Sequence, residues 1–303
     1  TMGGLLEGMQ TPGGTGAVRL AVALAKAAGV TRIHLGVPSW PNHAQILQDV
    51  GVETTTFHHA NADGTADIDA LLEAIGNARA TDAVLLHGCC HNPTGVDYTQ
   101  EQWGRIADAF VESGVLPILD VAYHGLGQGL DEDIAGVRQV LAKVPEALVA
   151  YSCDKNFGLY RDRVGAFYMI ARSAADLPAI VSNANALARA NWSMPPDHGG
   201  AAVRTVLRDE ELTSQWLDEL GEMRARMRRV RERLAAADNE VPSLNLAALG
   251  QQNGLFAMLP LSREQIAQLR EEHGIYMAGS GRINVAGLHE GNTPRFIAAL
   301  ADV

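Results

Sequence analysis

Residues 83–121 read AVLLHGCCHNPTGVDYTQEQWGRIADAFVESGVLPILDV and contain one complete strand–helix–strand unit. The first five residues and the last six are short, largely apolar runs typical of buried strands. Between them, Thr99 and Gln102 form a capping box that predicts the start of a helix, and Gly114 predicts its end. Two buried strands joined by one amphipathic helix predict a parallel β-α-β unit.

The same alternation of β-branched runs and amphipathic helices extends from Gly16 to about residue 170. We expect strands at Val52–His58, Ala147–Tyr151 and Val164–Ile170, and helices at Ala17–Ala28, Asp67–Ala80 and Asp133–Val144. The alternation predicts an α/β fold in which residues 1–222 form a large domain around a mainly parallel sheet.

A different pattern begins near Leu212, where one long helix is predicted to run to about Ala237. We expect its arginines to form a solvated helix face; they are Arg224, Arg226, Arg228, Arg229, Arg231 and Arg233. A second capping box then predicts a helix from Ser262, and strands are expected at Phe256–Leu259, Ile275–Met277 and Arg282–Val285. Residues 223–303 are therefore predicted to form a smaller C-terminal α+β domain.

The composition is that of a well-packed soluble protein, with 47% of the 303 residues hydrophobic and 19% charged. The formal net charge of −11 argues against a nucleic-acid partner, because phosphate backbones are bound by excess positive charge. No apolar run is long enough to span a membrane and no leader pattern is present, so we expect a cytoplasmic protein without a membrane partner.

Lysine is scarce, since only Lys26, Lys143 and Lys155 occur among the 24 basic residues. Lys155 follows the strand predicted to end near Tyr151, and α/β sheets bind ligands beyond such strand ends. A lysine shielded from water there can form a Schiff base with a carbonyl cofactor and can then move protons. By position alone, a surface lysine is the more common interpretation.

Two further features are open to more than one interpretation. Asp120 ends a predicted apolar strand, where its carboxylate could have a structural partner or could keep a pyridine nitrogen protonated. The segment 11–16 (TPGGTG) precedes a helix, so it could hold a phosphate or could be a flexible turn. The cluster 87–91 (HGCCH) is too crowded for the usual spacing of metal ligands, so no metal site is expected.

Seven motifs follow one another along the chain: GGTG (13–16), PSWPNH (38–43), HGCCHNPTG (87–95), DVAY (120–123), KNFGLY (155–160), RANWS (189–193) and SGRINVAG (280–287). In this order they resemble the aspartate/aromatic amino acid aminotransferase family, from one end of the chain to the other. The resemblance implies a fold-type-I transferase that depends on pyridoxal 5'-phosphate (PLP).

The resemblance also implies how the cofactor is held. The phosphate would be bound by Gly14, Thr15, Ser152 and Arg163. Trp40 would stack on the pyridine ring, and Asp120 would pair with the ring nitrogen, with His43 supporting Asp120 from behind.

The resemblance assigns catalysis to Lys155, Asp120 and Tyr123. Lys155 would be the Schiff-base lysine and then the acid/base of the proton shift. Asn92 and Tyr123 would bond the phenolic oxygen of the cofactor ring.

For the substrate, Arg282 would clamp the α-carboxylate, because a planar guanidinium matches a carboxylate. Arg189 would reach into the neighbouring subunit's site and bind a side-chain carboxylate, and the substrate site would include Trp40 and Asn92. The implied reaction moves the amino group of L-aspartate or an aromatic amino acid to 2-oxoglutarate by a ping-pong route. The implied assembly is a homodimer with shared active sites.

The chain departs from the family pattern at a few places. Asp154 stands where family members carry Ser, and Trp192 stands where Tyr is usual. The family also has an N-terminal arm, a substrate-covering loop and a crossing tyrosine ahead of the GGTG motif, and we expect these to be missing from the 303 residues. The alternative function is therefore a catalytically weak fragment that binds PLP and acts as a folding or interaction module.

Overall fold

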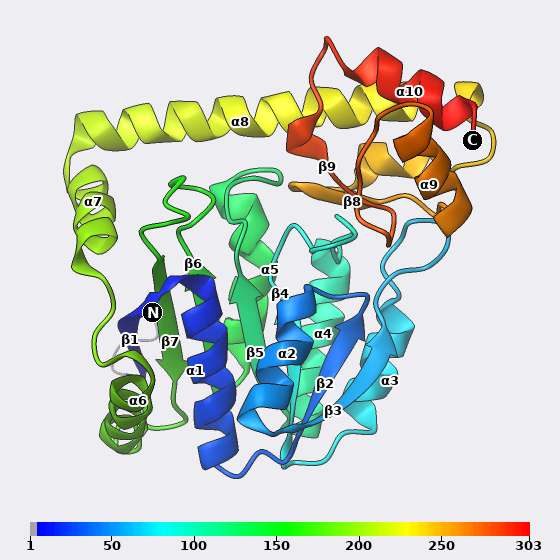
Figure 1. Ribbon diagram of the computed structural model, residues 1–303. Helices are drawn as coiled ribbons and strands as arrows, with labels where there is room; N and C mark the ends of the chain where they lie inside the picture. Colours follow the sequence, from blue (N-terminus) through cyan, green and yellow to red (C-terminus); the bar gives the residue numbers. More distant parts are fainter. Residues whose placement is uncertain (1–4) are drawn as a thin grey trace.

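A seven-stranded sheet forms the centre of the computed structural model, which describes residues 5–303 (Figure 1). Across the sheet the order is β1 (Leu6–Pro12), β7 (Val164–Ile170), β6 (Ala147–Ser152), β5 (Leu116–Val121), β4 (Asp82–His87), β2 (Arg32–Val37) and β3 (Glu53–His58). The five strands from β6 to β3 are parallel, whereas β7 is antiparallel to both β6 and β1. The prediction of an α/β fold with a mainly parallel sheet is therefore confirmed.

Helices cover both faces of the sheet and enclose one core on each side. One face carries α1 (Gly13–Ala27), α2 (Pro41–Val50) and α6 (Leu177–Trp192), and the other carries α3 (Ile68–Gly76), α4 (Gln100–Ser113) and α5 (Leu130–Lys143). Successive residues of β4 alternate between the cores, because side chains of a strand point to opposite faces. A strand buried on both faces reads as a continuous apolar run, as the segment 83–86 does.

Both predicted capping boxes form in the structure. The Thr99 side chain accepts from the Gln102 N–H and Gln102 bonds back to Thr99, while Gly114 ends α4 in the left-handed region at φ 69°. The same reciprocal bonds join Ser262 and Gln265 at the start of α9 (Arg263–Glu271).

Some element predictions need correction. Helix α1 begins at Gly13 rather than Ala17, so the GGTG motif forms its first turn instead of a loop before it. The segment Ile275–Met277 is not a strand, because the small sheet pairs only β8 (Phe256–Met258) with β9 (Arg282–Asn284). Strands β1 and β2 and helices α2, α6, α7 (Asp197–Arg208) and α10 (Thr293–Ala301) were not predicted.

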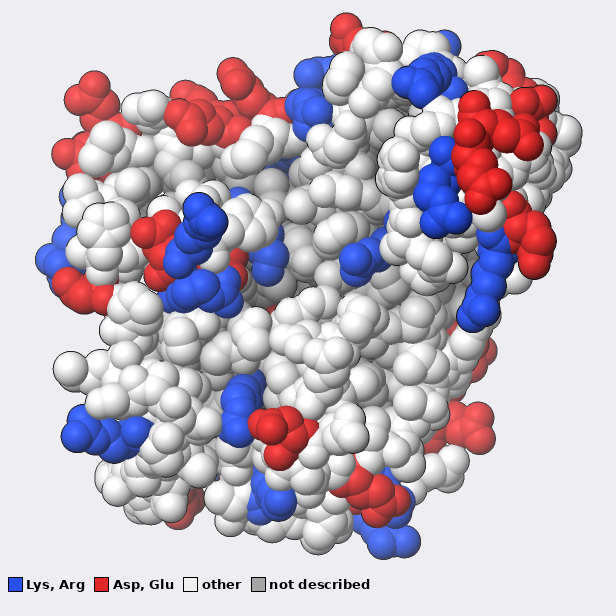
Figure 2. Space-filling model, viewed as in Figure 1, with Lys and Arg blue, Asp and Glu red and all other residues white. Residues whose placement is uncertain are grey.

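Helix α8 (Glu210–Ala236) joins the α/β layer to the smaller C-terminal part, which also contains α10 (Thr293–Ala301) and 3-10 turns at Asp238–Glu240, Ala247–Gln251 and Val285–Gly287. Acidic side chains gather over the α8 half nearest α7 (Figure 2), and the two in its first turn, Glu210 and Glu211, complement the helix dipole. The predicted domain boundary after residue 222 falls inside α8 and remains a prediction. Among the described residues, no helix is both long and apolar enough to cross a membrane.

The arginines of α8 do not form the uniformly solvated face that was predicted. Arg231 is only 2% exposed, and its guanidinium donates to the backbone carbonyls of Asn253, Gly254 and Phe256 at 2.7–3.0 Å. Burial lowers the pKa of Arg231 to about 10. The helical period explains the error, because the apolar residues Met227 and Leu234 share the buried side of α8 with Arg231.

We predict that Arg231→Met destabilises the protein by about 2–4 kcal/mol, because several buried carbonyls lose their donor. The exposed Arg233 offers a matched control on the same helix, and Arg233→Met should change the free energy of unfolding by less than about 0.5 kcal/mol. Urea denaturation of both variants measures the difference. Equal stability of the two variants would show that the buried contacts of Arg231 contribute nothing.

Candidate active site

The candidate site lies at the edge where the parallel strands end. His87 closes β4 and pairs in register with Asp120 of β5, and Lys155 lies three residues beyond the end of β6. A pocket at this edge is lined by Gly14, Thr15, Trp40, His87, Asn92, Asp120, Ala122, Tyr123 and Lys155. Seven of these nine residues were predicted site residues, so the fold brings together motifs that are far apart in the sequence.

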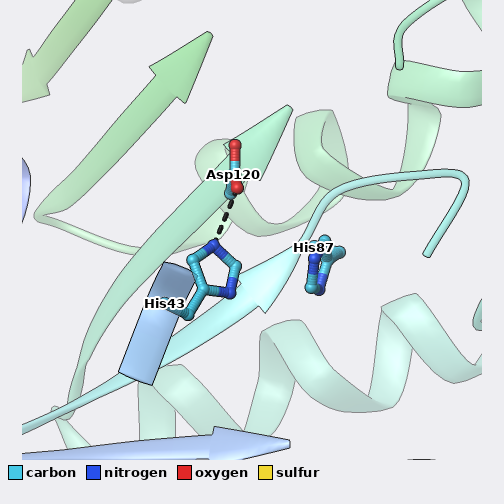
Figure 3. A group of neighbouring side chains, drawn as sticks. All are labelled: His43, His87 and Asp120. Carbon is cyan, nitrogen blue, oxygen red and sulfur yellow. Dashed lines mark hydrogen bonds and ion pairs between the residues drawn. The ribbon is translucent and has the colours of Figure 1, made fainter. Parts of the chain in front are cut away.

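Asp120 is held from behind by α2. His43 Nε2 lies 2.8 Å from Asp120 Oδ2 (Figure 3). Ser39 Oγ lies 3.0 Å from His43 Nδ1. The His43 side chain is fully buried and Asp120 is 3% exposed, so this pair is shielded from water. Asp120 Oδ1 is also buried and has no hydrogen-bond partner within residues 5–303. The pocket therefore contains a carboxylate oxygen that can accept a hydrogen bond from a ligand.

Lys155 faces this carboxylate across a partly dehydrated pocket. Burial lowers the pKa of its amine below the ordinary value, although the negative charges of Asp120 and Asp154 oppose the shift. The Lys155 Nζ lies 5.0 Å from the centre of the Tyr123 ring. A lysine with a lowered pKa is more often an uncharged nucleophile at neutral pH than a surface lysine is.

A second hydrogen-bonded group lines the opposite side of the pocket. Asn92 Nδ2 donates to the Tyr123 hydroxyl at 3.1 Å, and burial raises the pKa of Tyr123 well above its ordinary range. Arg282 donates to Asn92 Oδ1 at 3.3 Å, and its guanidinium lies 4.8 Å from the centre of the Phe256 ring. The C-terminal part thus places Arg282 next to Asn92, although Arg282 does not itself line this pocket.

The first turn of α1 forms one end of the site. Its N-cap is Pro12, and no side chain caps the first N–H groups of the helix. A side chain at Gly14 would bring its Cβ within 2.8 Å of Ser152 Cβ, so glycine allows the helix end to approach the end of β6. Arg163 lies beside the same turn and donates to Asp154 at 2.7 Å. Uncapped N–H groups beside a guanidinium suit an anion.

The predicted site residues and the residues that line the pocket do not fully coincide. Arg189 is exposed on α6, donates to Ser193 at 2.9 Å and does not line the pocket of its own chain. His87 and Ala122 line the pocket but were not predicted site residues. Burial lowers the pKa of His87 well below its ordinary value, so its ring is neutral, and its centre lies 4.8 Å from that of His43 (Figure 3). The position of His87 at the end of a predicted strand could have indicated that it lines the pocket.

The chain belongs to the family described as aminotransferase class I and II, whose model matches residues 6–300. Tyrosine aminotransferase of Rhizobium meliloti (strain 1021) is 50% identical over 284 residues, which cover 93% of this chain and 73% of the relative. Aspartate aminotransferase of Escherichia coli (strain K12) is 42% identical over 297 residues, covering 97% and 75%. These relatives identify the chain as an enzyme of the aspartate/aromatic aminotransferase group, as the motifs predicted.

A solved structure supports the same conclusion and the cofactor. The aromatic-amino-acid aminotransferase from Burkholderia pseudomallei, covalently bound to pyridoxal phosphate, matches with a TM-score of 0.95 at 34% identity, over 99% of this chain and 76% of that chain. The cofactor of this family is PLP. The likeness confirms the predicted fold class and the predicted cofactor.

We predict that Asp120→Asn lowers the pKa of the Lys155 amine further in the cofactor-free protein, because the negative charge that stabilises the ammonium form is lost. The pH dependence of Lys155 labelling by an amine reagent, followed by mass spectrometry, measures the shift. Asp108→Asn is the control, since Asp108 pairs with Lys143 instead. An unchanged or raised midpoint for Lys155 in Asp120→Asn would show that Asp120 does not act on this amine.

Proposed function

We propose that the enzyme transfers the amino group of L-aspartate, or of an aromatic amino acid, to 2-oxoglutarate by a ping-pong route, with Lys155 holding PLP as a Schiff base. The observation that carries this proposal is that the half-buried Lys155 lines the same pocket as Asp120, whose Oδ1 has no hydrogen-bond partner among the described residues, and that burial lowers the pKa of the Lys155 amine. A nucleophile and a carboxylate in this arrangement match the aldehyde and the pyridine nitrogen of the cofactor. The relatives favour this activity over a weak PLP-binding module.

The residues of the site fit PLP along its length. Asp120 Oδ1 offers an acceptor for a pyridine N–H, and the Asn92–Tyr123 pair offers donors for the phenolic oxygen. The first turn of α1 and Arg163 form the end that would receive the phosphate, together with Ser152. Trp40 lines the pocket and is available to stack on the ring. When bound, PLP supplies an electron sink for the carbanion that forms at the substrate α-carbon.

The proton transfer is proposed for Lys155. When its Nζ is not bonded to the cofactor, its lowered pKa favours the neutral amine, which can accept a proton from the substrate α-carbon. Asp120, oriented by its contact with His43, would accept a hydrogen bond from the ring nitrogen of PLP. The Tyr123 hydroxyl keeps its proton at neutral pH and so remains a hydrogen-bond donor.

The substrate carboxylate is proposed to bind Arg282, which is already oriented by Asn92 and by stacking on Phe256. Arg189 is proposed to bind the second carboxylate of aspartate or 2-oxoglutarate in the site of a partner subunit. Its exposure on α6 agrees with such a role, because an arginine that serves a neighbouring site must be accessible. We therefore propose a homodimer with shared sites, acting in the cytoplasm.

Addition of PLP should give a visible absorption band that requires Lys155, and L-aspartate should change that band because amino transfer alters the cofactor. Lys155→Ala should lack the band. Lys143→Ala, which removes an exposed lysine paired with Asp108, should retain it. A band that persists in Lys155→Ala would overturn the assignment of the lysine, and a band that does not respond to any amino donor would overturn the transaminase activity.

Mixed dimers test the shared site. Lys155→Ala and Arg189→Ala each impair both sites of their own homodimer, but a mixed dimer has one site with an intact Lys155 and an intact Arg189. Co-refolding equal amounts should therefore recover about a quarter of the wild-type rate with aspartate, because about half of the dimers are mixed. The unmixed variants are the controls. No recovery in dimers shown to be mixed would place Arg189 in its own subunit's site or outside catalysis.

A further inference from the structure

Asp154, the residue before Lys155, lies at the end of the site proposed to receive the cofactor phosphate. Its side chain is 6% exposed, and its Oδ2 accepts a hydrogen bond from Arg163 Nη1 at 2.7 Å. Its backbone N–H donates to Ser152 Oγ at 3.2 Å. Asp154 therefore contacts two of the four residues implied as phosphate ligands.

The Asp154 carboxylate also faces the first turn of α1. A Cβ built at Gly13 would lie 3.1 Å from Asp154 Oδ2, so the carboxylate lies close to the helix end that attracts anions. Its other oxygen, Oδ1, is buried without a hydrogen-bond partner in the described part of the chain. The side chain thus occupies an anion-binding position, although it is only partly satisfied there.

The negative charge of Asp154 would affect how the site binds the cofactor phosphate. A phosphate monoester carries about −1.5 to −2 charges at neutral pH and is held best by unneutralised positive charge. In this chain the guanidinium of Arg163 already has a carboxylate as its ion-pair partner. Two anions that approach one cation repel each other, and burial of the Asp154 side chain limits how far water screens this repulsion, although the Arg163 side chain is 36% exposed.

We propose that Asp154 competes with the cofactor phosphate for Arg163, and thereby sets how tightly this enzyme holds PLP. This inference rests on the proposed function, since it assumes that the phosphate binds at Arg163. Without PLP, the Asp154 carboxylate keeps Arg163 in place. When PLP binds, the carboxylate must share or give up that contact, so the phosphate adds less affinity than it would beside an uncharged residue.

The test compares dissociation constants of the cofactor-free protein for PLP and for pyridoxal, which lacks the phosphate. Asp154→Ser should bind PLP about tenfold more tightly than the wild type, or better, and should change the affinity for pyridoxal by clearly less, since loss of the Asp154 charge reaches pyridoxal only through the Lys155 amine. Asp154→Asn keeps the size of the side chain and removes only its charge, so it should behave like Asp154→Ser. Asp162→Asn is the matched control, because its carboxylate is on the same segment but lies 3.3 Å from His198. It should leave both constants unchanged.

Two other outcomes would overturn the proposal. Unchanged or weaker PLP binding in both Asp154 variants would overturn the proposal and make Asp154 a residue that only orients Arg163. Tighter binding of PLP and pyridoxal alike would also overturn it, since the effect would then lie at the ring or at Lys155. Failure of the proposed function has a different signature, because the wild type would then give no Lys155-dependent absorption band with either compound.

Discussion

The hydrogen bond between Asp120 and His43 is the contact on which the arrangement of the site depends. A carboxylate that is 3% exposed is stable only if it is paired, and its 2.8 Å contact with a fully buried imidazole supplies the partner. The pair connects β5 to α2, so it fixes the helix against the end of the sheet. It also uses only one oxygen of Asp120 and leaves the other facing the pocket.

Strand direction brings the remaining groups to the same place. The five parallel strands end at one edge of the sheet, and β1 runs in the same direction because β7 is antiparallel to both β1 and β6. The start of α1, the turn with Lys155 and the ends of β4 and β5 therefore meet. Helix α8 adds the C-terminal part, since Arg231 holds the segment that leads into β8, and Phe256 of β8 stacks with Arg282. The C-terminal part thus places one positive charge, that of Arg282, in contact with Asn92 of the pocket.

Much of this arrangement could be predicted because its signals are local. Apolar runs marked the central strands, the capping boxes at Thr99 and Ser262 marked helix starts, and the scarcity of lysine drew attention to Lys155. The ordered motifs then supplied the family, and with it residues such as Arg282 that lie far from Lys155 in the sequence. The roles of the individual site residues remain proposals.

Other features depend on tertiary contacts that no local pattern records. Arg231 shares the buried side of α8 with Met227 and Leu234, but its partners, the carbonyls of Asn253, Gly254 and Phe256, could not be identified from the sequence. The segment 275–277 is apolar enough for a strand but has no partner strand. The pairing of Asp154 with Arg163 depends on a turn between β6 and β7, so the sequence showed the unusual residue but not its contact.

Whether Lys155 holds the cofactor can be tested directly on the intact protein. After PLP binding and borohydride reduction, peptide mass mapping locates the lysine that carries the pyridoxyl group. If Lys155 forms the Schiff base, we expect stoichiometric labelling of Lys155, with Lys26 and Lys143 unmodified. Labelling of Lys26 or Lys143 while Lys155 stays unmodified would contradict it.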